Sequence, residues 1–543
     1  MILRRLVLFS LVIGIAAGLT ALVTRAMAPG GLGVWEWLTL LAFAGTAPWT
    51  ALCAANALLG FSLLMATRDA PAYLLPSLRQ AAAPRTRTAI IVCIRNEDMA
   101  TVLPPLERLM ADLPPAHFTL WFLSDTPGDG NGEEAAIAAL LPAARYRRRA
   151  QNTGFKAGNV MDFCDHHAGD HEFMLCLDAD SDMSAVAVLR LVGLMQADAR
   201  IAIIQQLIVG RPASAAFPRL FQFGMRAGMR MWAIGQAWWQ GDEGPYWGHN
   251  ALIRIAPFRQ HARLEALPDG SPILSHDQVE AVRLHAAGWK VVALPIEAGS
   301  MEGMPPALPE FMARDLRWGA GNMQYFSLLR LPGMTWMGRW QLAQAILLFA
   351  GAPLWVAVLV FATFNAAAGG ETDRAMLALA MLATWAALHA PKLLGYAQVM
   401  LTPALAAGYG GRGRFGRGAA LEIGFTTLLD PISVFNKAMF LAALPFRRLR
   451  GLGGQWAPQN RADRGVGWAD AARLLWPHTL FGVAVFALLP MSAWPWALPW
   501  AAGLVLAVPF CVVTSALEVS NWLGGRGLAA TPEELNPPVA PRP

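Results

Sequence analysis

The stretch Leu-Cys-Leu-Asp-Ala-Asp-Ser, Leu175–Ser181, decides how the rest of the chain is interpreted. Phe173–Leu177 is an apolar run of strand length, and two carboxylates, Asp178 and Asp180, follow it. Ligands of open α/β sheets bind outside the carboxyl ends of the strands. Carboxylates two residues apart suit a hard divalent cation that also binds substrate phosphates, so we predict a nucleotide diphosphate with Mg²⁺ or Mn²⁺. For this pair alone, turn acids or helix caps are the alternative.

The composition indicates an integral membrane protein. The 543 residues are 55% hydrophobic and 15% charged, whereas soluble domains carry roughly a quarter charged residues. The net charge of +6 comes largely from basic loops beside apolar runs, as in the cytoplasmic loops of membrane proteins. The basic excess therefore gives no reason to expect a nucleic acid partner. The five cysteines have no paired spacing, so we expect buried free thiols in a reduced compartment.

Apolar runs flank a more polar middle third. Leu6–Val23 and Trp37–Met65 are each long enough to cross a bilayer core of about 30 Å. Arg4 and Arg5 place the start of the first run inside, so the chain returns to the cytoplasm near residue 67. The spanning candidates after Arg339 are Gln341–Phe364, Ala375–Leu401 with a bend at Pro391, Leu474–Met491 and Trp494–Ala516.

Two further segments fit neither a simple span nor a soluble helix. Leu421–Leu444 is apolar but contains Glu422 and Asp430, so we expect a re-entrant hairpin or interfacial helices at about 420–446. Pro218–Trp239 alternates aromatic and Met residues with arginines. We interpret it as an amphipathic helix at the membrane surface, with a core-facing helix of the soluble domain as the alternative.

The middle third alternates short apolar runs with helical patterns, which predicts an α/β domain with a parallel sheet covered on both faces. The runs are Ala89–Ile94, Phe118–Ser124, Phe173–Leu177, Ile201–Val209 and Trp289–Pro295. The predicted domain organisation starts with a transmembrane hairpin over 1–66. A cytoplasmic catalytic domain follows over 67–335, with interfacial helices near 212–240 and 305–332. A transmembrane region over 336–520, with a cytoplasmic loop near 447–473, precedes a disordered tail over 521–543.

Other chemically useful residues follow the first two strands and a basic run. Glu97 and Asp125 come after strands one and two and can hydrogen-bond the uracil and ribose of a nucleotide, although either can instead cap a helix. Lys156 stands between Gly154 and Gly158 and can approach a diphosphate as a point charge. A solvated basic loop is the alternative for Lys156.

The remaining candidates lie nearer the second group of apolar runs. Asp277 opens a helix, and the local pattern favours a helix cap, whereas a carboxylate beside the donor sugar could deprotonate an acceptor hydroxyl. Arg317 can neutralise a leaving diphosphate, and Trp318 offers an aromatic face to a sugar ring. An acceptor-sugar platform is expected from the aromatic and polar stretch that includes Trp247, Gly248 and His249.

Taken in chain order, the motifs are an acid after strand one, Ser-Asp after strand two, Asp-Ala-Asp-Ser, Ser-His-Asp and Arg-Asp-x-Arg-Trp. They resemble the processive inverting family-two glycosyltransferases, to which cellulose synthase belongs. The chain is most similar to one branch, the glucans biosynthesis glucosyltransferase H family of osmoregulated periplasmic glucan synthesis. Members carry a long extension before the first span, whereas this sequence starts almost at the membrane, so we expect no regulatory role seated there. The matching stretches are Tyr246–Asn250, Ile273–Asp277 with Val279–Ala281, Arg314–Trp318 with Gly321 and Asn322, and Pro458–Arg461.

The resemblance implies a GT-A-type α/β domain inserted in a helical multi-pass region of the bacterial inner membrane, with the catalytic domain in the cytoplasm. UDP-glucose would be the donor and the growing β-glucan the acceptor, extended processively and passed to the periplasm. Mg²⁺ or Mn²⁺ would be the cofactor. Membrane lipid would contact the spans. Acyl carrier protein would be a further partner, a requirement that the sequence leaves open.

The resemblance also implies a role for each candidate residue. Asp277 would be the general base that activates an acceptor glucose hydroxyl. Another processive synthase (cellulose, chitin or hyaluronan type), a polyprenyl-phosphate sugar transferase and a non-enzymatic nucleotide-sugar sensor stay open. The other implied roles are uridine binding by Glu97 and Asp125, nucleotide support by Lys156, UDP and metal binding by Asp178 and Asp180, acceptor binding by Trp247, Gly248, His249 and Trp318, diphosphate binding by Arg317, and a gating loop at Trp456–Arg461.

Overall fold

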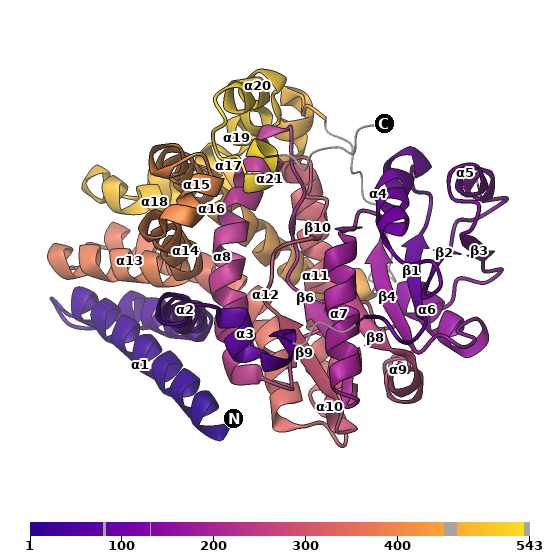
Figure 1. Ribbon diagram of the computed structural model, residues 1–543. Coiled ribbons are helices and arrows are strands. Elements are labelled where there is room, and N and C mark those ends of the chain that lie inside the picture. Colours follow the sequence, from indigo (N-terminus) through magenta and orange to yellow (C-terminus); the bar gives the residue numbers. More distant parts are fainter. Residues whose placement is uncertain (80–82, 131, 450–463, 537–543) are drawn as a thin grey trace.

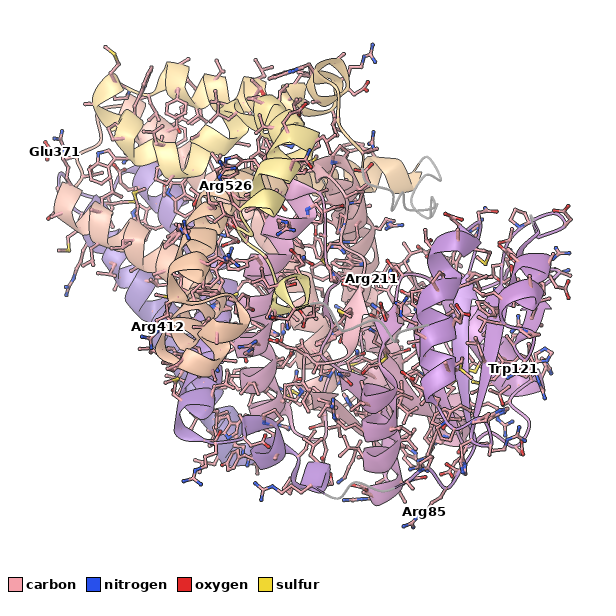
Figure 2. All side chains as sticks on the ribbon, turned by 45° about the horizontal axis from the view of Figure 1, so that its top comes forward. Arg85, Trp121, Arg211, Glu371, Arg412 and Arg526 are labelled. Carbon is pink, nitrogen blue, oxygen red and sulfur yellow. The ribbon has the colours of Figure 1, made fainter. Side chains whose placement is uncertain are left out.

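The computed structural model describes four stretches of the chain, residues 1–79, 83–130, 132–449 and 464–536. The expected gating loop at Trp456–Arg461 lies outside these residues. Figure 1 shows the strands with their covering helices on one side and the long helices from both ends of the sequence on the other. In Figure 2, Trp121 in the strand part and Glu371 in the helical part lie at opposite ends of the molecule.

The GT-A-type α/β fold is built on a mixed sheet of seven strands. In spatial order these are β3 (Arg145–Arg148), β2 (Phe118–Ser124), β1 (Thr88–Ile94), β4 (Phe173–Asp178), β8 (Ala251–Arg254), β6 (Ile201–Gln206) and β9 (Lys290–Leu294).

The expectation of an all-parallel sheet is wrong at one strand. β1 to β4 run parallel to one another, and β6 runs parallel to β9, but β8 is antiparallel to both β4 and β6. Ala251, at the start of β8, pairs with Cys176 near the carboxyl end of β4. The chain therefore enters β8 from the edge where β4 ends, and it must run in the opposite direction.

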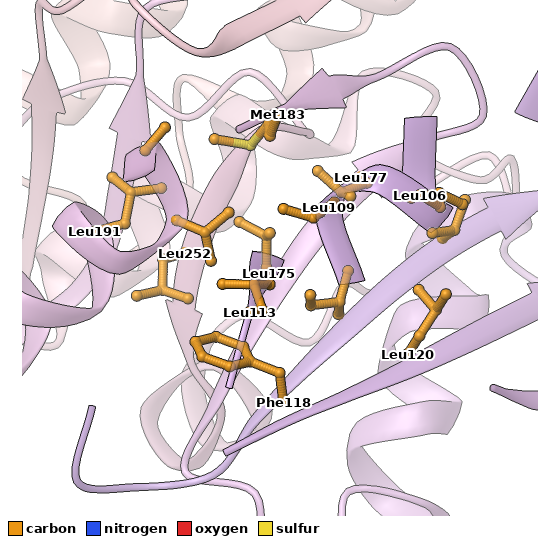
Figure 3. Close-up of a cluster of buried hydrophobic side chains, with 14 of the residues drawn as sticks. Leu106, Leu109, Leu113, Phe118, Leu120, Leu175, Leu177, Met183, Leu191 and Leu252 are labelled. Carbon is orange, nitrogen blue, oxygen red and sulfur yellow. The ribbon is translucent and has the colours of Figure 1, made fainter. Parts of the chain in front are cut away.

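Alternating side chains build a core on each face of the sheet. Ile90 and Val92 of β1 belong to a cluster with α4 (Met99–Asp112), α5 (Glu133–Leu140) and α7 (Ala185–Ala197), whereas Ala89 and Ile91 face α6 (Phe155–His166), α9 (Ile255–His261) and α10 (His276–Ala286). Figure 3 shows leucines of α4, β4 and α7 meeting in the first cluster. Two buried faces require apolar residues at every position of a strand, which explains the continuous apolar runs.

A second, smaller sheet lies beyond the carboxyl end of β4. Its strands are β5 (Asp182–Met183), β10 (Ser300–Glu302) and β7 (Val209–Gly210), in that spatial order. The helix α11 (Leu308–Leu328) follows β10. In this sheet β5, which follows the Asp178–Asp180 turn, pairs with β10, the strand that leads into α11.

Within the described residues, five helices are long and apolar enough to cross a membrane, or up to seven if each bent pair is one span. The chain is thus built as a multi-pass membrane protein, and the expected bend near Pro391 is confirmed. The five are α1 (Ile2–Met27), α2 (Val34–Ala66), α12 (Trp336–Ala367), α16 (Arg412–Leu449) and α17 (Trp468–Leu488); the pairs are α13 (Arg374–Leu388) with α14 (Ala390–Leu401), bent by 74°, and Met491–Val505 with α19 (Ala507–Ser515), bent by 58°.

A re-entrant hairpin does not form at 420–446, because α16 runs through this stretch as one helix. Its polar residues find partners in the first turn of α14 and in His389, the residue that precedes α14. Lys392 donates a hydrogen bond of 2.8 Å to Glu422, and the ring Nε2 of His389 lies 2.8 Å from a carboxylate oxygen of Asp430. The neighbouring helix removes the need to bring these groups back to water.

The amphipathic segment forms α8 (Ala216–Gln240), which lies between the two parts of the molecule. On one side, the Trp239 indole donates to Asn56 of α2 at 2.8 Å. On the other, the Arg230 guanidinium donates to Glu297, which follows β9, at 2.6 Å. Contact with the membrane surface stays a prediction for this helix.

The prediction of a disordered tail over 521–543 is wrong as far as Asn536. This stretch holds the end of α20 (Leu517–Gly525) and all of α21 (Pro532–Leu535). Glu534 lies 2.7 Å from Arg219 of α8, and Glu533 pairs with Arg226. The ordering comes from charges on α8 more than three hundred residues earlier in the chain, a tertiary contact that composition does not reveal.

Candidate active site

The carboxyl edge of the large sheet brings the predicted residues together. Cys93 of β1 is in register with Asp178 of β4, and Ile94 with Ser124 of β2. The loops that follow these three strands therefore start side by side. Asp125 and Glu97 come from two of those loops, and the Asp178–Asp180 turn comes from the third.

Lys156 and Asp178 form the centre of the site. Lys156, in the first turn of α6, makes an ion pair with Asp178 and donates a 2.8 Å hydrogen bond to the carbonyl of Gly248. Burial by itself lowers the pKa of this ammonium, but the charge and hydrogen bond of Asp178 together with Cys176 and Cys93 outweigh burial, so the pKa of Lys156 lies above its usual value. Lys156 is thus a fixed cation and not a solvated loop residue.

The donor set of the metal prediction fits Mg²⁺ or Mn²⁺. Asp178 and Asp180 are both partly exposed carboxylates. Among the described residues, no group of three or more His, Cys, Asp or Glu side chains forms a closed metal cage. Mg²⁺ keeps several waters and is held by one or two carboxylates together with substrate phosphates, which matches an open pair of this kind.

His249 lies against the same carboxylate. Its Nδ1 is 3.7 Å from Oδ2 of Asp178, and its Nε2 is 2.8 Å from Oε2 of Glu302, which ends β10. Burial lowers the pKa of this imidazole, but Asp178 and Glu302 outweigh burial and raise the pKa to about 9. The Trp247 backbone N–H donates to Gln205 at 2.8 Å, which fixes the start of the Trp247–His249 stretch.

Asp277 also approaches Gly248. Gly248 has φ of +89°, and a Cβ built there would lie 3.6 Å from the Cβ of Asp277. Ser275 is the cap residue of α10, so Asp277 lies in the first turn and is not the helix cap that the local pattern favoured. Burial raises the pKa of Asp277 although the neighbouring His276 lowers it.

The helix α11 packs on the turn that carries Asp277. The Tyr325 hydroxyl donates to the Ser275 carbonyl at 2.8 Å, and the Gln324 side chain accepts from Leu274 N–H at 2.8 Å. Gly321 faces Ser275 so closely that a Cβ built on the glycine would lie 2.0 Å from the serine hydroxyl oxygen. The helix that carries Arg317 and Trp318 is therefore held directly against the candidate base.

The two side chains predicted on α11 differ in exposure. Trp318 is 47% exposed and Arg317 is partly buried. The Arg314 guanidinium lies over the Trp318 ring, 4.9 Å from its centroid. The indole is thus held by a cation–π contact and keeps a free face.

The predicted uridine-binding acids have different surroundings. Asp125 is buried and receives two hydrogen bonds from Arg149, at 2.8 and 2.6 Å. Glu97 is partly exposed, and its neighbour Asp98 caps α4 by accepting from Ala100 N–H. A helix-cap role therefore falls to Asp98 and not to Glu97 or Asp125.

Sequence reasoning missed three charged residues of the site. Arg149 belongs to a basic run that we treated as a whole, and nothing in the run singles it out. Glu302 follows no recognisable motif and reaches the site only through the small sheet. Glu280 lies one helical turn after His276, 3.0 Å from its ring; its spacing at i+4 was the available signal.

Comparison with known proteins agrees with this geometry. Residues 173–409 match the family model "Glycosyl transferase family group 2". Glucans biosynthesis glucosyltransferase H of Xanthomonas campestris pv. campestris (strain B100) is 32% identical over 94% of this chain and 84% of its own length. The protein of the same name from Caulobacter vibrioides (strain NA1000 / CB15N) is 32% identical over 90% of this chain and 78% of its own.

Among solved structures, the mannosyltransferase PcManGT from Pyrobaculum calidifontis, in complex with GDP-Man and Mn²⁺, is 17% identical with a TM-score of 0.42. It covers 64% of this chain and 99% of its own, a likeness too weak to carry an argument. The sequence relatives are similar over nearly the whole chain. The chain therefore belongs to the glucans biosynthesis glucosyltransferase H family, and it is a glycosyltransferase of glucan synthesis.

Proposed function

We propose that the protein polymerises glucose from UDP-glucose into a β-glucan and passes the chain across the bacterial inner membrane. The observation that carries the proposal is that Asp277 and the Lys156–Asp178 pair converge on Gly248. A donor diphosphate and an attacking hydroxyl need such an arrangement, with positive charge at one end and a base at the other. The relatives' name, glucans biosynthesis glucosyltransferase H, supports glucose as the sugar.

The donor would bind along the carboxyl edge of the sheet. Asp125 and Glu97 would hold the uridine, while Arg149 fixes the Asp125 carboxylate. Mg²⁺ or Mn²⁺, held by Asp178 and Asp180, would supply charge neutralisation to the diphosphate. Lys156 and Arg317 add fixed cations, which stabilise the charge that develops on the leaving UDP.

Asp277 would act as the general base. Its carboxylate removes the proton from an acceptor glucose hydroxyl as that oxygen attacks the anomeric carbon. One such displacement inverts the α-linked donor to a β-linked product, so no covalent enzyme intermediate is required. Its partly buried setting keeps the carboxylate more basic than an exposed aspartate.

The acceptor end would rest on the aromatic stretch and α11. Trp247, Gly248, His249 and the open face of Trp318 would hold the terminal sugar. The helices after residue 335 would carry the growing chain to the periplasm, with the sheet domain in the cytoplasm. Acyl carrier protein is proposed as a partner on the family's example alone.

The test is radiolabelled sugar incorporation by the purified full chain with UDP-glucose and Mg²⁺, with and without acyl carrier protein, beside Asp277→Asn. Polymer that a β-glucanase digests, from the wild type only, is the expected result. The variant should lose about 10²–10⁴-fold in rate. Incorporation from UDP-GlcNAc instead would identify a chitin or hyaluronan type of synthase. A labelled lipid product would identify a polyprenyl-phosphate transferase, and UDP binding without any turnover would identify a sensor.

A further inference from the structure

Glu302 lies at the end of β10, in no motif that the sequence singles out. β10 pairs with β5, the strand that begins two residues after Asp180, and with β7. A Cβ built on the next residue, Gly303, would lie 3.4 Å from both the Cβ and Oδ2 of Asp180. The small sheet thus fixes Glu302 relative to the Asp178–Asp180 turn.

On the donor side, Glu302 holds His249. A carboxylate only accepts hydrogen bonds, so Nε2 of His249 carries the proton across the 2.8 Å contact. The Nδ1 atom of the ring then lies 3.3 Å from the Trp247 carbonyl oxygen and 3.7 Å from Oδ2 of Asp178. Neither side chain is solvated: the exposed fractions are 14% for His249 and 21% for Glu302.

On the acceptor side, Glu302 and Arg314 of α11 are near enough for their charges to attract, which favours the charged form of both groups. Arg314 in turn lies 4.9 Å from the centroid of the Trp318 ring. Positive and negative charges therefore alternate from Lys156 and Asp178 through His249 and Glu302 to Arg314.

Resting on the proposed function, we propose that Glu302 is a positioning residue for glucosyl transfer. It holds the His249 ring beside Asp178 from the end of β10, the strand that leads into α11 and its acceptor residue Trp318. Hydrogen-bonding partners behind the side chains of a metal site set the orientation of those side chains. Removal of such a partner typically costs about 10–100-fold in metal affinity or activity.

The test compares Glu302→Ala and Glu302→Gln with the wild-type full chain in lipid nanodiscs. The alanine variant should lower kcat by about 10–100-fold, with a smaller change in KM for UDP-glucose, because Lys156 and Asp125 still bind the nucleotide. Glutamine keeps an oxygen that accepts from His249, so it should restore most of kcat. An alanine variant with wild-type kcat, or a glutamine variant no better than alanine, would overturn the proposal.

The matched control is Glu172→Ala. Glu172 also pairs with an arginine, Arg254, but it precedes β4 and lies at the opposite end of that strand from Asp178. We expect this variant to keep the wild-type kcat. Equal melting temperatures of the three variants exclude a general loss of folding.

A second readout does not need a donor. In cryo-EM structures without substrate, the His249 ring should leave Asp178 in the alanine variant and stay in the glutamine variant. An unmoved ring in the alanine variant would refute the positioning role. A wild type that fails to polymerise glucose from UDP-glucose would refute the proposed function instead, while the ring positions still decide the role of Glu302.

Discussion

Asp277 and Asp178 are both carboxylates of the site, but their surroundings differ. Asp178 lies in contact with the Lys156 ammonium and near His249, which suits a group that binds cations. Burial is the largest cause that raises the pKa of Asp277. The charge of Glu280 also raises this pKa, whereas His276 and Lys156 lower it. Burial disfavours the charged form, so the two acids are suited to different roles.

The pH dependence of kcat/KM follows from the raised pKa of Asp277. A base acts only when deprotonated, so the rate falls as the pH drops through its pKa. The acid limb should therefore lie above the usual aspartate value of about 3.9. A pH profile of initial rates in buffers of constant ionic strength measures this. An acid limb at the ordinary aspartate position would argue against Asp277 as the base.

At the scale of elements, the contact between α11 and the start of α10 joins the proposed acceptor site to the proposed base. Three residues of α11 make it: Gly321 by close approach, and Gln324 and Tyr325 by hydrogen bonds. Gly321 is needed because the Ser275 turn occupies the space that any side chain would fill. The close approach of α11 to this turn thus requires glycine at position 321.

Gly321→Ala should lower both stability and activity. The added Cβ would lie 2.0 Å from the Ser275 hydroxyl oxygen and 2.9 Å from its backbone N, so the helix or the turn must move. Overpacking of this kind costs about 1–3 kcal/mol in free energy of unfolding. Thermal unfolding in detergent and the polymerisation rate measure the two effects.

Gly351→Ala on α12 is the control, because a Cβ there meets nothing within 4 Å. Alanine favours a helix over glycine by up to about 1 kcal/mol, so this variant should be neutral or more stable. Equal behaviour of the two alanine variants would contradict the packing argument.

At the scale of the whole molecule, the two ends of α1 belong to two separate groups of contacts, one beside the sheet and one far from it. Arg5 near the start of α1 and Thr335 before α12 both bind Glu243, at 2.6 and 3.0 Å, beside the sheet. At the far ends of these helices, Asp373 N–H donates to the Ala26 carbonyl at 2.8 Å. Figure 2 shows Glu371 of this far group well away from Arg85 of the sheet part.

Cysteine labelling should therefore distinguish the far group from the sheet part. Ala28→Cys and Glu371→Cys, both exposed in the far group, should react with a membrane-impermeant maleimide added to intact spheroplasts. Arg85→Cys should react only after the membrane is opened. The native cysteines are buried or partly buried and set the background. Labelling of all three from outside would refute the proposed cytoplasmic sheet domain.

The C-terminal segment stabilises the molecule through buried ion pairs. Glu534→Ala would leave Arg219 buried without its partner; the two side chains are only 8% and 10% exposed. Removal of one member of a buried pair costs about 3–5 kcal/mol, so the melting temperature should fall clearly. Asp470→Ala breaks an ion pair in which both side chains are largely exposed, and it should change little. Equal shifts in the two variants would contradict the role of burial.

The sequence by itself determined the features that depend on neighbouring residues. The lengths of the apolar runs predicted the spanning candidates other than α16, and Pro391 predicted the bend. The strand before Asp178 and Asp180 predicted where the candidate site lies. Most strands were visible for the same reason, since a strand buried on both faces is apolar throughout.

Only the tertiary structure decided what depends on residues distant in the chain. The antiparallel β8, the unbroken α16 and the ordered tail each follow from a partner far away in sequence. Glu302 is the clearest case: a single carboxylate carries no local pattern, and it enters the site because β10 pairs with β5 beside Asp180. Local patterns report burial and backbone preference, whereas long-range contacts are fixed by the packing of the whole chain.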